Sequence, residues 1–243
     1  MKSIKNKFKK ILNAVGLNVH KFNALSTAAG LLNQSLKYFE IDLVFDIGAN
    51  EGQYAEQIIS GGYKGKIYSF EPLTSAHLTL VKNSQNFSNW IVYPRCALGE
   101  SECSMTMNVS SNSVSSSLLP MRETHISAAP NSKYLAQEVT KVITLDSIFN
   151  SIATEARNPF LKIDTQGYEW QVLNGSSLVL DKVKGIQIEL SLVSLYEGQR
   201  LWQDVLTRLE GLGFTLWGLQ PAFTNHSNGR VMQIDGLFLG SEI

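Results

Sequence analysis

The chain has 243 residues, of which 44% are apolar and 17% charged, and 21 basic and 21 acidic residues give a net charge of zero. This length suits one sizeable α/β domain, and this composition argues against a disordered chain. The balanced charge argues against a nucleic-acid partner, because such proteins usually carry a basic excess. No apolar run approaches the roughly 20 residues that a membrane-spanning helix needs.

The first 21 residues carry six lysines and no acidic residue. Apolar side chains recur there at helical spacing, at Ile4, Phe8, Ile11, Leu12 and Val15. The pattern predicts an amphipathic helix, with two interpretations. The helix packs on the domain or on a second subunit of a homodimer, which is the commoner arrangement, or it makes peripheral contact with an anionic membrane surface. We expect a helical extension over residues 1–38 and the main domain over residues 39–243.

From residue 42 onward, short apolar runs alternate with helical patterns. Five buried strands are predicted, at residues 42–47, 66–70, 90–93, 160–164 and 185–190. Helices are predicted through Tyr54 and Ile58, from Glu71 through Val81, from Glu169 to Val183 and from Trp202 to Leu212. A final strand pair, residues 214–219 and 233–239, has no helix between its members. The alternation predicts a Rossmann-like, seven-stranded, mainly parallel sheet with an antiparallel C-terminal strand and helices on both faces.

The regular pattern breaks over about residues 100–140, which are rich in Ser, Thr, Asn and Met. Met105 and Met107 alternate with polar residues, which predicts a short antiparallel strand. The stretch from Asn108 to Ala136 is too long for an ordinary connection and is typical of a lid or binding loop. Regularity returns with residues 139–148. The two cysteines, Cys96 and Cys103, are interpreted as free thiols of a cytoplasmic protein.

The first predicted strand leads directly into a loop that reads Asp46-Ile47-Gly48-Ala49-Asn50-Glu51-Gly52. Its glycines allow tight turns, and the free amides of the loop would face a ligand that sits at the start of the next helix. The spacing differs from the Gly-x-Gly-x-x-Gly dinucleotide pattern, and Asp46 would repel a pyrophosphate. It suits a ligand with a cationic head, such as the amino end of S-adenosylmethionine. The alternative is a plain glycine turn.

Two more acids follow the ends of predicted strands. Glu71 comes nineteen residues after Gly52, where a carboxylate can accept both ribose hydroxyls of a nucleoside. Its alternative role is a solvated acid at a helix start. Asp164 ends the fourth strand, at the edge where ligands of open α/β sheets bind. It could orient a substrate hydroxyl, take its proton, or cap a helix.

These motifs, in this order, resemble the FkbM family of S-adenosylmethionine-dependent methyltransferases over about residues 43–239. The matching segments are Val44 to Gly52, Ser69-Phe70-Glu71-Pro72, Ala97-Leu98-Gly99, Val142 to Asp146 and Leu161-Lys162-Ile163-Asp164-x-x-Gly167-x-Glu169. The last segment is the most specific to the family. The resemblance implies methylation of hydroxyl oxygens on sugars and polyketide-type natural products. The serine-rich segment 110–117 is a departure, so the identity of the substrate does not transfer.

The resemblance also implies a cofactor site for S-adenosylmethionine. Its cofactor-binding residues would be Asp46, Gly48, Ala49, Asn50, Gly52, Tyr54, Glu71, Pro72, Cys96, Ala97, Leu98 and Asp164. The loop would hold the methionine part, Glu71 the ribose, and residues 96–98 the adenine. Asp164 would stand at the methyl-transfer centre. No second acidic ligand is marked by its spacing, so no metal site is predicted.

The predicted reaction is attack of an acceptor hydroxyl oxygen on the activated methyl group, which a base assists. Asp164 is the first candidate base, Glu189 the second, and His125 a third in a loop that could close over the site. The acceptor would be a small molecule or glycan. Two alternatives stay open: a nicotinamide-dependent oxidoreductase, and a nucleoside-binding fold without catalysis that serves as an interaction module.

Overall fold

The computed structural model describes residues 10, 12–14, 16, 25 and 27–240. Most of the predicted lysine-rich helix therefore lies outside the described residues. Within the described part, no helix is long and apolar enough to cross a membrane.

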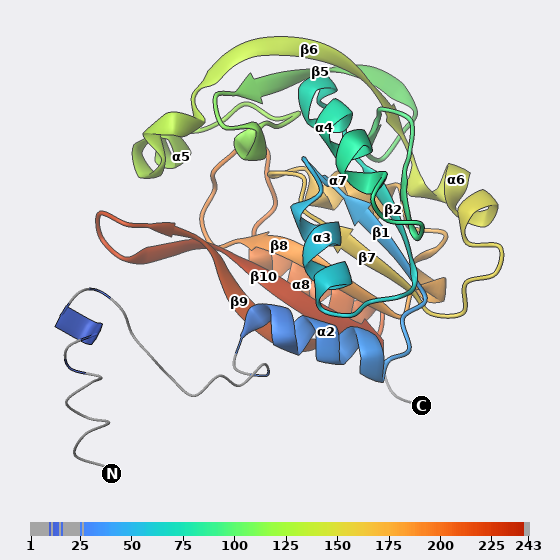
Figure 1. Ribbon diagram of the computed structural model, residues 1–243. Helices are drawn as coiled ribbons and strands as arrows, with labels where there is room; N and C mark the ends of the chain where they lie inside the picture. Colours follow the sequence, from blue (N-terminus) through green and yellow to red (C-terminus); the bar gives the residue numbers. More distant parts are fainter. Residues whose placement is uncertain (1–9, 11, 15, 17–24, 26, 241–243) are drawn as a thin grey trace.

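The core of the protein is a seven-stranded sheet with the strand order β3-β2-β1-β7-β8-β10-β9 (Figure 1). The strands are β1 (Leu43–Ile47), β2 (Lys66–Phe70), β3 (Trp90–Val92), β7 (Pro159–Ile163), β8 (Gly185–Ser191), β9 (Phe214–Asn225) and β10 (Arg230–Gly240). All neighbours pair in parallel except β10, which is antiparallel to both β8 and β9. This arrangement confirms the predicted fold class.

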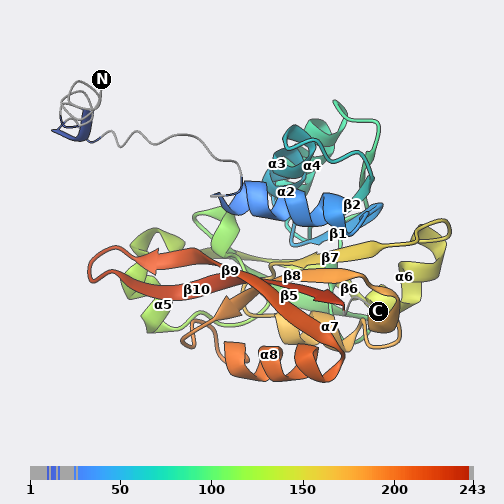
Figure 2. The ribbon, with the colours of Figure 1, turned by 90° about the horizontal axis from the view of Figure 1, so that it is seen from below.

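Helices cover both faces of the sheet (Figure 2). They are α2 (Ala28–Tyr38), α3 (Gln53–Ser60) and α4 (Thr74–Ser84) on one face, and α6 (Leu145–Ile152), α7 (Glu169–Asn174) and α8 (Trp202–Gly211) on the other. The alternation of β1 divides the core, because successive side chains of a strand point to opposite faces. Phe45 packs in the cluster with α6, α7 and α8, whereas Val44 packs with Leu32, Leu36 and Ile58 of α2 and α3.

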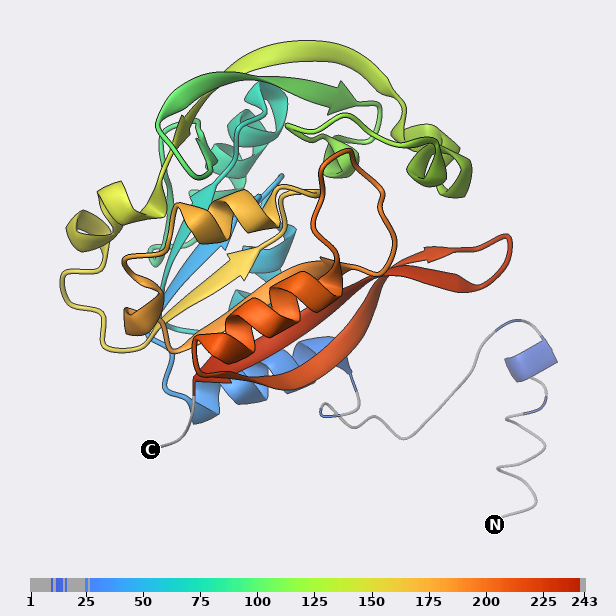
Figure 3. The same ribbon diagram turned by 180° about the vertical axis from the view of Figure 1, so that it is seen from behind.

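The segment that interrupts the alternation forms a second, three-stranded sheet with the order β4-β6-β5. Its strands are β4 (Ala97–Leu98), β5 (Cys103–Ser110) and β6 (Tyr134–Ile143), and β5 pairs antiparallel with β6, as Met105 and Met107 predicted. The segment predicted as a long loop holds the helix α5 (Glu123–Ala128) and two 3-10 turns. This sheet arches over the loops at one end of the main sheet (Figure 3).

One predicted helix is too long. The helix expected from Glu169 to Val183 ends at Asn174, and a separate 3-10 turn covers Leu180–Lys182. The reason is the close approach of Gly175 to the Gly99 carbonyl, where an added Cβ would lie 1.8 Å from the oxygen. The Gly175 carbonyl also accepts a hydrogen bond from the amide of Asp146. These tertiary contacts end the helix after six residues.

Candidate active site

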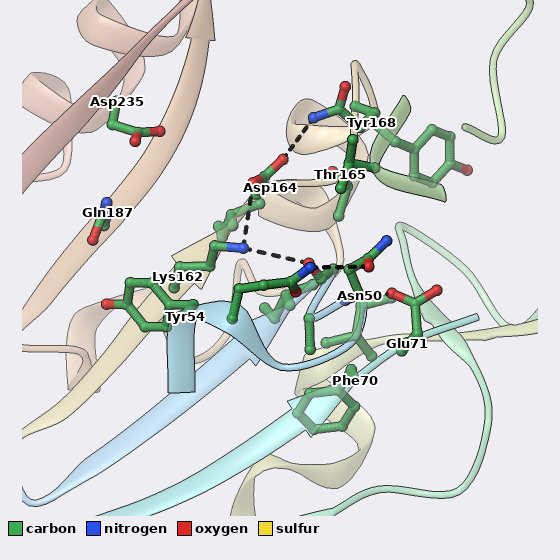
Figure 4. A pocket seen from close by; sticks show the side chains of 18 of the residues that line it. Asn50, Tyr54, Phe70, Glu71, Lys162, Asp164, Thr165, Tyr168, Gln187 and Asp235 are labelled. Carbon is green, nitrogen blue, oxygen red and sulfur yellow. Dashed lines mark hydrogen bonds and ion pairs between the residues drawn. The ribbon is translucent and has the colours of Figure 1, made fainter. Parts of the chain in front are cut away.

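A cavity of about 520 Å³ lies at the ends of β1, β2 and β7, within the size range of small-molecule sites (Figure 4). Its lining residues fall into two groups, which we call the loop lobe and the hairpin lobe. The loop lobe comprises Gly48, Ala49, Asn50, Glu71, Pro72, Cys96, Ala97 and Leu98. The hairpin lobe comprises Leu31 and Leu32 of α2, Tyr54 of α3, Gln187 of β8, and Trp217 and Asp235 of the β9–β10 hairpin. Lys162 and Asp164 lie between the two lobes.

The loop after β1 is built by close contact with its neighbouring strands. Gly48 has φ +78°, and a Cβ there would lie 1.8 Å from the carbonyl oxygen of Asp164, so only glycine fits. The amides of Gly48 and Ala49 both donate to the Phe70 carbonyl at 3.0 Å, and the amide of Asn50 donates to Glu71. The expectation of free amides is therefore wrong: the protein itself uses these donors to fix the shape of the loop.

Two predicted cofactor residues, Asp46 and Gly52, lie behind the cavity wall. Gly52 packs against the indole of Trp90. Asp46 is fully buried, and its Oδ2 accepts a hydrogen bond from Ser69 at 3.0 Å. Burial raises the pKa of Asp46, and Lys162 partly offsets this effect. The structure thus directs the Asp46 charge toward Lys162 and not toward a ligand.

Glu71 directly follows β2 and lines the cavity, with its carboxylate held by two backbone amides. Oε2 accepts the Asn50 amide at 2.7 Å, and Oε1 accepts the Leu73 amide at 2.8 Å. A carboxylate has about four acceptor positions, so about two remain for a ligand. Burial raises its pKa to about 7, although the two amide bonds work in the opposite direction.

Lys162, which the sequence did not single out, links the acids of the site. Its Nζ lies 3.4 Å from Asp164 Oδ2 and 3.6 Å from Asp46 Oδ1, and it donates to the Gly48 carbonyl at 3.3 Å. Burial alone would lower the pKa of Lys162, but the carboxylates of Asp164, Asp46 and Asp235 outweigh it and raise the pKa. The sequence did contain a signal for this role. Lys162 is the one charged residue in an otherwise apolar buried strand, and a buried charge needs a partner of opposite charge.

Asp164 and Glu189, the first two candidate bases, are brought together by Gln166. The side-chain nitrogen Nε2 of Gln166 donates to Asp164 Oδ1 at 2.8 Å and to Glu189 Oε2 at 3.1 Å. The side-chain oxygen of Gln166 accepts a hydrogen bond from the Tyr196 hydroxyl. Asp164 faces the cavity with 34% of its side chain exposed. Glu189 is buried, and burial followed by repulsion from Asp164 raises its pKa well above the ordinary value. This environment favours its protonated form.

His125 lies apart from this group. It belongs to the short helix α5, not to a loop, and does not line the cavity. Its ring contacts Tyr196 and Phe223, each at 5.2 Å between centroids. Burial lowers its pKa to about 4, which favours the neutral ring. The structure places His125 in a packed cluster and gives its predicted catalytic role no geometric support.

The three residues expected beside adenine, Cys96, Ala97 and Leu98, all line the loop lobe near Phe70. Burial raises the pKa of the Cys96 thiol to about 12, so this side chain is a neutral, apolar contact. Both cysteines are free.

The serine-rich segment covers the site. The Ser113 hydroxyl donates to the Asn50 side-chain oxygen at 3.2 Å, and the Ser117 hydroxyl donates to the backbone carbonyl of Gln166 at 2.7 Å. The segment therefore contacts both loops that shape the cavity. Within residues 27–240 and the few described before them, no group of three or more His, Cys, Asp or Glu side chains is placed to hold a metal ion.

A family model described as the methyltransferase FkbM domain matches residues 46–216, which is more than half of the chain. The chain belongs to this family. The expectation of a methyltransferase is thus confirmed, and S-adenosylmethionine is the cofactor that this membership supports. No curated protein matches the sequence.

Solved structures with a similar fold include the methyltransferase FkbM from Methylobacillus flagellatus, at 15% identity and a TM-score of 0.48. That match covers 81% of this chain but only 44% of the other protein. An rRNA methylase from Streptococcus thermophilus matches at 9% identity and TM-score 0.48, over 92% of this chain and 100% of its own. A fibrillarin from Aeropyrum pernix with natively bound S-adenosyl-L-methionine matches at 7% and 0.46, over 82% and 66%. The family assignment depends on none of these structures.

Proposed function

We propose that this FkbM methyltransferase transfers a methyl group from S-adenosylmethionine to a hydroxyl oxygen of a sugar, glycan or natural product. The observation that carries the proposal is the placement of two carboxylates on one cavity. Glu71 has open acceptor positions beside an apolar wall, and Asp164 lies on the other side of the Gly48 loop. The first suits a nucleoside, and the second suits a hydroxyl that must lose a proton.

The residues of the loop lobe fit the adenosyl part of S-adenosylmethionine. Glu71 would accept the two ribose hydroxyls, and the neutral wall at Cys96, Ala97 and Leu98 would contact the adenine. When bound, S-adenosylmethionine supplies a methyl group that is already activated by a positively charged sulfur. The acidic surroundings of the cavity favour such a cation over a dinucleotide.

Asp164 is arranged to receive the proton of an acceptor hydroxyl. Lys162 Nζ lies 3.4 Å from its Oδ2, and the side-chain amide of Gln166 donates a hydrogen bond to its Oδ1, so both oxygens are held in place. Asp164 would take the proton of the acceptor hydroxyl while the hydroxyl oxygen bonds to the methyl carbon. The bond between that carbon and the sulfonium sulfur would break at the same time, which leaves neutral S-adenosylhomocysteine. Glu189, in its protonated form, acts only indirectly, through the hydrogen bond to Gln166.

The glycine loop does not favour the oxidoreductase alternative. A dinucleotide pyrophosphate is bound by free amides of the glycine loop. Here the amides of Gly48, Ala49 and Asn50 are occupied by the protein. Experiment distinguishes the methyltransferase from the other alternative, a nucleoside-binding interaction module without catalysis.

The proposal extends to location and partners. We propose a cytoplasmic protein that acts on a small molecule or glycan and not on nucleic acid, which the zero net charge supports. The lysine-rich residues 1–21 would contact a second subunit of a homodimer or an anionic membrane.

Two measurements test the proposed function. Calorimetry should detect binding of S-adenosylhomocysteine, the demethylated product, and no binding of NAD. A screen with radiolabelled S-adenosylmethionine over sugars, glycolipids and aromatic alcohols should then yield methylated product. Binding of NAD alone would overturn the proposal, and S-adenosylhomocysteine binding without transfer to any acceptor class would favour the interaction module.

A further inference from the structure

We propose that the hairpin lobe is the acceptor subsite, and that it binds an amphiphilic alcohol: a hydroxylated head group joined to an apolar chain. This inference rests on the proposed O-methyl transfer and adds a class of acceptor to it. The head would lie deep in the lobe next to Lys162, and the chain would leave between α2 and the β9–β10 hairpin.

The deep end of the hairpin lobe presents polar atoms without partners. The hydroxyl of Tyr54 and the side-chain carbonyl of Gln187 are both buried and make no hydrogen bond within the protein. Both residues line the cavity, with Asp235 beside them (Figure 4). Buried polar groups are nearly always hydrogen-bonded in proteins. One donor and two acceptors that have no partner within the protein match the hydroxyl groups of a ligand.

This polar end adjoins the transfer centre. Lys162 Nζ lies 5.5 Å from the centre of the Tyr54 ring and 3.4 Å from Asp164 Oδ2. Figure 4 shows Tyr54, Gln187 and Asp235 on one side of Lys162, and Asn50 and Glu71 on the other. A head group held by Tyr54 and Gln187 would thus lie across Lys162 from the ribose site, where one of its hydroxyls can reach Asp164.

The outer end of the lobe is apolar and exposed. Leu31 and Trp217 line the cavity, yet 42% and 52% of their surfaces face solvent. Leu32 and Leu237 continue the apolar lining inward. An edge-on contact with Phe39, at 5.4 Å between centroids, holds the Trp217 ring in place. Exposed apolar side chains at a cavity mouth are typical of a site that covers them with a ligand.

The amino-acid end of S-adenosylmethionine is a poor occupant for this mouth. Its carboxylate and ammonium would lose water against Leu31 and Trp217 without gaining a partner of opposite charge there. An alkyl or isoprenoid chain has no charged or polar group that would lose water there. Each fully buried methylene improves its affinity by about fourfold.

The test uses the full chain saturated with S-adenosylhomocysteine and compares methyl with hexyl glycosides of glucose, galactose and rhamnose by calorimetry. We expect the hexyl form of at least one sugar to bind on the order of tenfold or more tighter than its methyl form, since a partly exposed mouth captures a fraction of the five added methylenes. Equal affinity of the methyl and hexyl forms, or no binding of any of the six glycosides, would overturn the inference.

Matched variants localise the effect. Leu31→Ala should remove most of the gain from the hexyl chain, whereas Leu78→Ala, an equally conservative change at a helix position that is 67% exposed and away from the cavity, should leave it unchanged. Tyr54→Phe should weaken methyl and hexyl glycosides equally. If Tyr54→Phe weakens only S-adenosylhomocysteine, the lobe belongs to the cofactor and the inference fails.

The outcomes separate this inference from the proposed function. If the wild-type chain does not bind S-adenosylhomocysteine at all, the proposed function itself is overturned. Normal S-adenosylhomocysteine binding without a chain-length effect would overturn the amphiphilic acceptor alone.

Discussion

The loop lobe and the hairpin lobe share one cavity but differ in how their polar groups are satisfied. In the loop lobe, the amides of Gly48, Ala49 and Asn50 and both oxygens of Glu71 have partners inside the protein. In the hairpin lobe, Tyr54 and Gln187 carry buried polar atoms with none. The first lobe is preorganised for a fixed ligand, and the second leaves its hydrogen-bonding groups for the ligand to satisfy.

The difference also follows the origin of the two lobes. The loop lobe is built mainly from turns that directly follow β1 and β2, so its shape depends on local backbone contacts. The hairpin lobe is assembled from α2, α3, β8 and the β9–β10 hairpin, which come together only through tertiary packing. We therefore expect substitutions in the loop lobe to affect the cofactor, and substitutions in the hairpin lobe to affect the acceptor.

The largest effect is expected at the boundary between the lobes. Asp164→Asn should lower turnover by about 100- to 10,000-fold with any acceptor found, because the amide cannot take the hydroxyl proton. Affinity for S-adenosylhomocysteine should change by less than about threefold, since the substitution leaves the loop lobe intact. Turnover and calorimetry measure the two effects separately.

Glu189→Gln is the matched control for Asp164→Asn. Its carbonyl can still accept the hydrogen bond from Gln166, and the native carboxyl favours its neutral form, so turnover should fall by less than about threefold. Equal losses in both variants would contradict the assignment of Asp164 as the base.

The second expected effect is on the loop lobe. Gly48→Ala should lower the free energy of unfolding by roughly 3 kcal/mol or more, because a positive φ adds to the collision with the Asp164 carbonyl. Urea unfolding measures the loss, and calorimetry should show weakened binding of S-adenosylhomocysteine. Gly62→Ala is the control, since Gly62 has φ +99° with nothing within 4 Å. It should cost only about 1–2 kcal/mol. Equal costs would show that the close approach at Gly48 does not matter.

The sequence predicted most of the residues that line the loop lobe and few of those that line the hairpin lobe. Tyr54 was predicted at the cofactor, whereas it lines the hairpin lobe. The motifs around Gly48, Glu71 and Asp164 are contiguous segments at strand ends, and the order of strands fixes which ends meet. Nothing local marks Gln187 as a site residue, because its place in the cavity depends on which elements pack beside β8. Even in the loop lobe, the local sequence does not show that Phe70 and Glu71 accept hydrogen bonds from the loop. The amides of residues 48–50 were therefore wrongly expected to be free.

The third expected effect is on nucleoside binding. Glu71→Gln should weaken S-adenosylhomocysteine by about tenfold or more, because hydrogen bonds to a charged acceptor contribute more than those to a neutral one. Calorimetry measures the change at pH 8, where the wild-type carboxylate is mostly ionised. The affinity of acceptor glycosides should stay the same. A parallel loss of both ligands would contradict the division into two lobes.

The smallest expected effect is on the pH dependence. Burial raises the pKa of Glu71 to about 7, so between pH 4.5 and about 7 the folded state binds more protons than the unfolded state. Stability from this group is therefore present at low pH and falls as pH rises through that window. Affinity for S-adenosylhomocysteine should rise over the same window, because the ionised carboxylate accepts both ribose hydroxyls. Urea unfolding and calorimetry at pH 5.5 and 8 check the opposite signs, and Glu71→Gln should flatten both curves.

The most direct test of the cofactor assignment is a crystal structure of the chain with S-adenosylhomocysteine. We expect both ribose hydroxyls within hydrogen-bond distance of the Glu71 carboxylate and the adenine against Cys96, Ala97 and Leu98. The sulfur should lie on the side of Gly48 that faces Asp164. A nucleoside bound in the hairpin lobe, with its ribose at Tyr54 and Gln187 and Glu71 free of contacts, would contradict it.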